Sequence, residues 1–84
     1  MRVLLVEDDE VLGDAMCDHL ASEGHAVDWA GSIEAAGDFL RVTRYQLMVL
    51  DLQLPDGMGD VLLRKLRSSG EAFPVIIVTA RDQL

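Results

Sequence analysis

Short apolar runs alternate with longer amphipathic stretches along this chain. Residues 3–6, 46–50 and 75–79 are predicted to be buried parallel strands, because strands covered on both faces are apolar almost throughout. Residues 26–30 alternate between apolar and polar positions, which favours a strand with one face or edge exposed. We place this strand at the edge of the sheet.

Three helices are predicted between these strands. Residues 10–23 carry Leu12, Met16 and Leu20 four positions apart, and Gly24 ends the pattern. Ser32 is a suitable N-cap for a helix that runs to about residue 42, and a third helix covers roughly residues 60–69. The order β-α-β-α-β-α-β with short connections predicts an α/β fold with a parallel sheet and right-handed crossovers.

The last strand, residues 75–79, is apolar on both faces and would need a further neighbouring strand. The sequence stops soon after it, so we expect an exposed apolar edge, which favours pairing with another chain. A homodimer or a strand-swapped dimer is one expected outcome.

Composition limits the functions that this domain can have. The 84 residues suffice for one small domain, and a net charge of -8 disfavours direct attraction to nucleic acid or to an anionic membrane. The single cysteine, Cys17, has no disulfide partner and is expected to be a small core residue in a reducing compartment. With no signal-peptide core and no stretch of membrane-spanning length, the chain is expected to be cytoplasmic.

Acidic side chains follow two of the predicted buried strands. Glu7 and Asp8 come after the first, and Asp51 comes after residues 46–50. In open α/β sheets functional groups gather outside the carboxyl ends of the strands, so these acids converge if the two strands are neighbours. Clustered carboxylates must take up protons or hold a cation, and their hard oxygen ligands suit Mg²⁺.

A carboxylate can act as a nucleophile toward phosphorus and form an acyl phosphate, which is the role that we assign to Asp51. The hydroxyl of Thr79 and the backbone N–H of Ala80, at the end of the last strand, could donate to the phosphoryl oxygens. Taken singly, each feature has a structural explanation. The acids of residues 7–10 suit a helix start, Asp51 a turn, and Thr79 a strand. Their conjunction favours a phosphate-handling site.

At this point the sequence resembles the receiver domain of bacterial two-component response regulators, the CheY-like family. The resemblance runs through LLVEDDEVL, LMVLDLQLPDGMG and PVIIVTARDQL, and the VEDD, LPD and TARD segments look most like the OmpR/PhoB winged-helix branch. It implies a flavodoxin-like sheet of strand order 2-1-3-4. It also implies Mg²⁺ at Glu7 and Asp8, phosphorylation at Asp51, and a metal contact from the backbone carbonyl of Gln53.

The resemblance further implies that a sensor histidine kinase supplies the phosphoryl group and that Thr79 moves toward it when the domain switches. DNA would be bound only through a C-terminal domain that lies outside this chain. The family's fifth strand, its phosphate-contacting lysine and its last two helices would lie beyond residue 84, so residues 1–84 are expected to form the N-terminal part of a receiver domain. Met58-Gly59 also replaces the Asp-Gly that the family usually has before its third helix.

Two other classes of function remain open on the sequence. One is a haloacid-dehalogenase-like phosphatase, which would need a second aspartate two residues after Asp51, where this chain has Gln53. The other is a phosphorylation-silent receiver fragment that acts as an interaction or dimerisation module.

Overall fold

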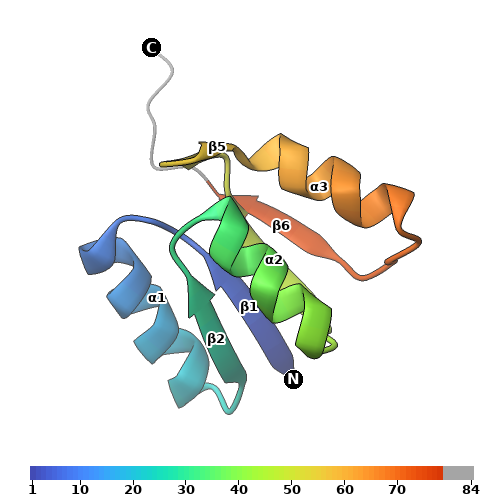
Figure 1. Cartoon of the computed structure of the whole chain (residues 1–84). Coiled ribbons are helices and arrows are strands. Elements are labelled where there is room, and N and C mark those ends of the chain that lie inside the picture. Colours follow the sequence, from blue (N-terminus) through green and yellow to red (C-terminus); the bar gives the residue numbers. More distant parts are fainter. Residues whose placement is uncertain (79–84) are drawn as a thin grey trace.

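The computed structural model describes residues 1–78, and Figure 1 shows their arrangement. In chain order the elements are β1 (Arg2–Val6), α1 (Glu10–Ser22), β2 (Ala26–Ala30), α2 (Ile33–Val42), β3 (Leu47–Asp51), β4 (Gln53–Leu54), β5 (Gly57–Met58), α3 (Gly59–Ser68) and β6 (Val75–Val78). The predicted strands and helices are all present, with bounds that differ from the predicted ones by one or two residues. Thr79 and Ala80 lie outside the described residues.

The central sheet has four parallel strands in the order β2-β1-β3-β6. Counting only these four strands along the chain, this is the predicted order 2-1-3-4, with β2 at one edge as expected. The arrows of β1, β2 and β6 in Figure 1 point toward the end of the sheet at which β5 lies. Residues at the carboxyl ends of β1 and β3 are therefore brought to that same end, because Val6 pairs with Leu50.

Side chains of β1 and β3 alternate between two apolar layers, as strand geometry requires. On one face, Leu4, Val6, Met48 and Leu50 pack with residues of α2 and α3. On the other face, Val3, Leu5 and Val49 pack with Met16, Cys17 and Leu20 of α1. Helices thus cover both faces of the two central strands, which explains why these strands are apolar throughout.

Local capping residues set the helix ends. Asp9 precedes α1 and its Oδ1 accepts from the N–H groups of Val11 at 3.0 Å and Leu12 at 3.1 Å. Ser32 caps α2 as predicted, with its Oγ accepting from the N–H of Ala35 at 3.0 Å. After α1 the chain turns at Gly24, whose φ of 93° is readily adopted only by glycine.

One part of the fold was not predicted. No regular structure was predicted between the strand 46–50 and the third helix, yet this segment forms an antiparallel hairpin in which Gln53 pairs with Met58 and Leu54 with Gly57. Strands of two residues are too short for an alternating pattern to reveal them. The turn of this hairpin contains Pro55 and Asp56.

One further expectation was met in part, and another was confirmed. Cys17 lies on α1 and is half-buried against the sheet rather than fully buried in the core. Burial and the neighbouring carboxylates of Asp14 and Asp18 raise the pKa of its thiol. The expected apolar edge is confirmed within residues 1–78, because Ile76 and Ile77 of β6 are 50% and 49% exposed.

Candidate functional site

Three carboxylates meet at the carboxyl end of the sheet. Glu7 and Asp8 follow β1, and Asp51 is the last residue of β3. Oxygen atoms of the three side chains all lie within 4.8 Å of one another. Glu7 and Asp51 are almost fully buried, with 3% and 8% exposure, whereas Asp8 is exposed. The convergence predicted from the sequence is therefore confirmed.

Backbone groups orient the two buried carboxylates. The N–H of Asp9 donates to Glu7 Oε2 at 3.1 Å, and the N–H of Gln53 donates to Asp51 Oδ1 at 3.1 Å. These contacts fix the position of one oxygen on each side chain. Both donors come from the short segments that directly follow β1 and β3.

The electrostatics of the cluster are visible in Glu7. Burial raises the pKa of this carboxyl above its ordinary value, and the hydrogen bond from Asp9 opposes that rise. A hydrogen bond with the Asp51 side chain and the negative charges of Asp51 and Asp8 raise the pKa further. The cluster therefore disfavours full ionisation unless a cation is present.

The donor set fits a hard divalent cation. It consists of carboxylate oxygens, one of them on an exposed residue, and Mg²⁺ usually binds through one or two carboxylates while retaining several waters. Gln53, the predicted source of a backbone carbonyl ligand, begins β4 directly beside this cluster. The predicted phosphate contacts, Thr79 and Ala80, are outside the described residues.

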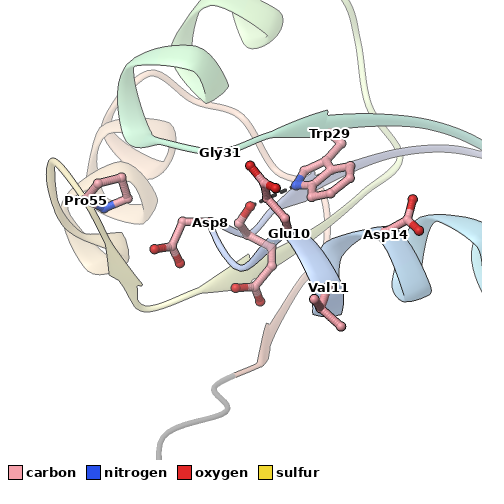
Figure 2. Close-up of a pocket in the computed structure, with 8 residues that line it drawn as sticks. Asp8, Glu10, Val11, Asp14, Trp29, Gly31 and Pro55 are labelled. Atoms are coloured by element: carbon pink, nitrogen blue, oxygen red, sulfur yellow. Dashed lines mark hydrogen bonds between the residues drawn. The ribbon is translucent and has the colours of Figure 1, made fainter.

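An open cavity of about 1040 Å³ lies over the exposed side of the cluster. Figure 2 shows Asp8 between Pro55 on one side and Glu10 and Trp29 on the other. The walls of the cavity come from the ends of β1 and β2, the start of α1 and the hairpin turn. The lining residues are Glu7, Asp8, Glu10, Val11, Asp14, Trp29, Gly31 and Pro55.

The start of α3 packs tightly against the end of β3. The N–H of Gly59 donates to the carbonyl of Leu52 at 2.7 Å. A Cβ at Gly59 would lie 2.6 Å from the carbonyl oxygen of Asp51, which is too close for any side chain. The glycine of Met58-Gly59 is therefore needed here, although methionine replaces the usual aspartate before it.

The family comparison agrees with this geometry. Residues 3–84 match the family described as response regulator receiver domain. This chain belongs to that family. A receiver domain is a phosphoacceptor switch of two-component signalling rather than a conventional enzyme, and receiver domains bind Mg²⁺.

Relatives of this receiver domain include regulators of the OmpR/PhoB type. It is 40% identical to the transcriptional regulatory protein PmrA of Pectobacterium parmentieri over 84 residues, and 44% identical to the swarming motility regulation protein RssB of Serratia marcescens over 84 residues. In both comparisons the alignment covers 100% of this chain and 38% of the relative. The chain thus spans little more than a third of the length of these curated relatives.

Solved structures show the same fold. The HemR receiver domain of Leptospira biflexa, described as non-phosphorylated, superposes with a TM-score of 0.89 at 37% identity, covering 99% of this chain and 67% of that one. The MaeR response regulator bound to beryllium trifluoride gives a TM-score of 0.89 at 29% identity, and the match covers 99% of this chain and 70% of that one. The response regulator TrrA of Thermotoga maritima, in complex with Mg(2+)-BeF, gives a TM-score of 0.89 at 26% identity, and the match covers 96% of this chain and 70% of that one.

Sequence reasoning missed one residue that supports the site from a distance. This residue is Trp29, which donates its indole N–H to the backbone carbonyl of Glu7 at 2.8 Å (Figure 2). Its ring packs so closely on α1 that a Cβ at Gly13 would lie 2.1 Å from it. An aromatic residue at the end of an edge strand was the available signal.

Within residues 1–78, no helix has the length and apolar character needed to cross a membrane.

Proposed function

We propose that this receiver domain accepts a phosphoryl group on Asp51, from the phosphohistidine of a sensor histidine kinase or from a small phosphodonor. Glu7, Asp8, Asp51 and the backbone carbonyl of Gln53 would hold Mg²⁺. The observation that carries the proposal is the convergence of three carboxylates within 4.8 Å from the ends of two neighbouring strands. Two of the three carboxylates, Glu7 and Asp8, also line an open cavity.

In the proposal, Asp51 is the nucleophile. Its Oδ1 accepts from the N–H of Gln53, so Oδ2 is the oxygen left to attack phosphorus. As the new O–P bond forms, the P–N bond of the phosphohistidine breaks and the electron pair returns to the imidazole. Mg²⁺, when bound, offsets negative charge on the transferring phosphoryl group.

Thr79 and Ala80 complete the proposed site. Thr79 follows β6, which pairs with β3 so that Val78 lies beside Asp51. In the proposal, the Thr79 hydroxyl and the Ala80 N–H donate to phosphoryl oxygens. The acyl phosphate then favours one of two conformers of the domain, which is a population shift.

The chain is proposed to be the N-terminal part of a receiver domain in a longer regulator. Several relatives are named as transcriptional regulatory proteins, and this chain aligns with only 38% of their length. In the proposal, DNA is bound by a C-terminal domain of the parent protein, and phosphorylation of Asp51 controls it. The cognate histidine kinase is the expected protein partner.

Incubation with MgCl₂ and acetyl phosphate, followed by intact mass spectrometry, tests the phosphoacceptor. A single phosphoryl adduct is expected, and it should be absent from Asp51→Asn and without Mg²⁺. Asp18→Asn, which removes an exposed acid of α1, is the matched control and should be modified like the wild type. An adduct that persists in Asp51→Asn would refute the assignment.

A second candidate function is an interaction module without phosphorylation. The exposed side chains of Ile76 and Ile77 on β6 favour it, because an unpaired apolar strand edge is prone to pairing with another chain. This candidate predicts a stable dimer in sedimentation velocity that neither MgCl₂ nor acetyl phosphate changes. A chain that stays monomeric would remove the support for it.

A further inference from the structure

The hairpin that follows the phosphoacceptor strand reaches across to a different helix. Asp56 lies in the turn between β4 and β5. Its Oδ1 accepts from the N–H of Ile33 at 2.8 Å, and its Oδ2 accepts from the N–H of Glu34 at 3.0 Å. One carboxylate thus binds two of the free N–H groups in the first turn of α2.

This contact is favourable as a charged interaction. A carboxylate at a helix N-terminus is stabilised by the helix dipole and by hydrogen bonds from the free backbone N–H groups. The two hydrogen bonds from Ile33 and Glu34 lower the pKa of Asp56, even though the side chain is exposed. The charged form therefore predominates at neutral pH.

The hairpin and α2 also touch through Gly57. This residue has a φ of 145°, which glycine tolerates and other residues rarely adopt. A Cβ here would lie 3.1 Å from Cδ1 of Ile33, so the absence of a side chain lets the hairpin turn approach the helix. Two independent contacts hold the same pair of segments together.

Capping α2 does not by itself require Asp56. Ser32 already caps the helix, with its Oγ accepting from the N–H of Ala35. What Asp56 adds is a link between the helix and the segment that carries Gln53. The base of that segment is closed by the 2.7 Å hydrogen bond from Gly59 to Leu52, and Asp56 holds its tip.

We propose that Asp56 is a positioning residue, which anchors the β4–β5 hairpin to the N-terminus of α2 and so keeps Gln53 and Asp51 in the geometry that binds Mg²⁺. The metal-binding part of this inference rests on the proposed function. Partners of this kind, which orient the direct ligands, typically alter metal affinity by about 10-fold or more when removed.

Asp56→Ala and Ser32→Ala form a matched pair of variants. Both remove acceptors from the N-terminus of α2, and both are expected to lower the midpoint of thermal unfolding. Only Asp56→Ala detaches the hairpin. Amide NMR spectra followed during a MgCl₂ titration should therefore show about 10-fold weaker Mg²⁺ binding in Asp56→Ala and wild-type binding in Ser32→Ala.

Hydrogen exchange provides a readout that needs no metal. The amides of Gln53 and Gly59 are both hydrogen-bonded, to Asp51 and Leu52. Their exchange should accelerate by about 10-fold in Asp56→Ala and stay unchanged in Ser32→Ala, relative to amides of β1. Asp56→Asn keeps a carbonyl acceptor without the charge, so it should fall between the wild type and Asp56→Ala in both measurements.

The outcomes separate the two proposals. If Asp56→Ala and Ser32→Ala change Mg²⁺ affinity and amide exchange to the same extent, Asp56 is a helix cap and nothing more. If Asp56→Ala accelerates amide exchange but leaves Mg²⁺ affinity unchanged, the link to the metal site is overturned. A wild-type chain that binds no Mg²⁺ would overturn the proposed function, while exchange at Gln53 and Gly59 would still decide whether Asp56 holds the hairpin. If Asp56→Ala fails to fold, Asp56→Asn decides the same questions.

Discussion

Replacing Asp51 by Asn should stabilise this domain when no divalent cation is present. The substitution keeps the size of the side chain and an Oδ1 that can accept from Gln53 N–H, but it removes one of three negative charges. Two of these charges, on Glu7 and Asp51, lie on nearly buried side chains, where water screens them poorly. The residue proposed as the phosphoacceptor therefore costs folding free energy.

The size of the gain follows from the geometry. Two unit charges 4.8 Å apart repel by about 3.5 kcal/mol at an effective dielectric constant near 20. Asp51 has two such neighbours, but Asp8 is exposed, so solvent screens its charge strongly. A net gain of about 2 kcal/mol in the free energy of unfolding is expected.

The sign of the pH dependence is fixed by Glu7. Its pKa is raised in the folded state, so its contribution to stability is present below its unfolded pKa and is lost as pH rises through the folded value. The gain from Asp51→Asn should accordingly be largest near pH 7.5. It should shrink as pH falls through the raised pKa of Glu7, where this side chain takes up a proton.

Urea unfolding in EDTA and in MgCl₂ measures both effects. At a Mg²⁺ concentration ten times its dissociation constant, the wild type should gain about 1.4 kcal/mol, and Asp51→Asn should gain much less. Asp18→Asn removes one negative charge outside the cluster and controls for net charge. The reasoning is refuted if Asp51→Asn is no more stable than the wild type in EDTA, or if Asp18→Asn produces the same gain.

Other parts of the structure give further predictions. Tyr45, the only tyrosine of the chain, donates to Asp28 at 2.5 Å and has a pKa raised by burial and by that contact to about 12. Tyrosinate absorbance should report this value, and roughly 2 kcal/mol of stability should be lost between pH 10 and 12, because only the unfolded state loses the proton there. In thermal unfolding, Gly59→Ala should lower the free energy of unfolding by about 2 kcal/mol, because the new Cβ would overpack against Asp51. Gly37→Ala should raise it by about 1 kcal/mol, because Gly37 lies in the middle of α2 and a Cβ there would have no atom within 4 Å. Trp29→Phe removes the donor to the Glu7 carbonyl and should lower stability in urea by about 1 kcal/mol; no change would show that this hydrogen bond contributes nothing.

The features that could be predicted from the sequence are those that local pattern determines. Apolar runs identify β1 and β3 because these strands are covered on both faces, and a similar run identifies β6 at the edge of the sheet. Ser32 and Gly24 mark helix ends through short-range backbone effects. The acidic cluster was predictable for a related reason. In a parallel sheet the strand ends meet, so residues that follow buried strands become neighbours.

The features that could not be predicted depend on contacts between distant parts of the chain. Asp56 and Ile33 are 23 positions apart, and Trp29 and Glu7 are 22 apart. No periodicity relates such residues, and the hairpin that carries Asp56 has strands of only two residues. Aspartate in a Pro-Asp-Gly turn has an ordinary local explanation, so its role at α2 appears only in the folded structure.

The core explains why the acids stay together despite their repulsion. Two of the acids directly follow fully buried side chains, Val6 before Glu7 and Leu50 before Asp51. Separating the carboxylates would require those strand ends to part, and exposing one such side chain costs about 1.5 to 3 kcal/mol, which is comparable to the net cost of about 2 kcal/mol estimated above for the charge of Asp51. The strand ends therefore hold the acids close, and a cation or a proton is the lower-energy way to relieve the charge. Metal binding, phosphoryl transfer and fold stability should consequently be coupled at this end of the sheet.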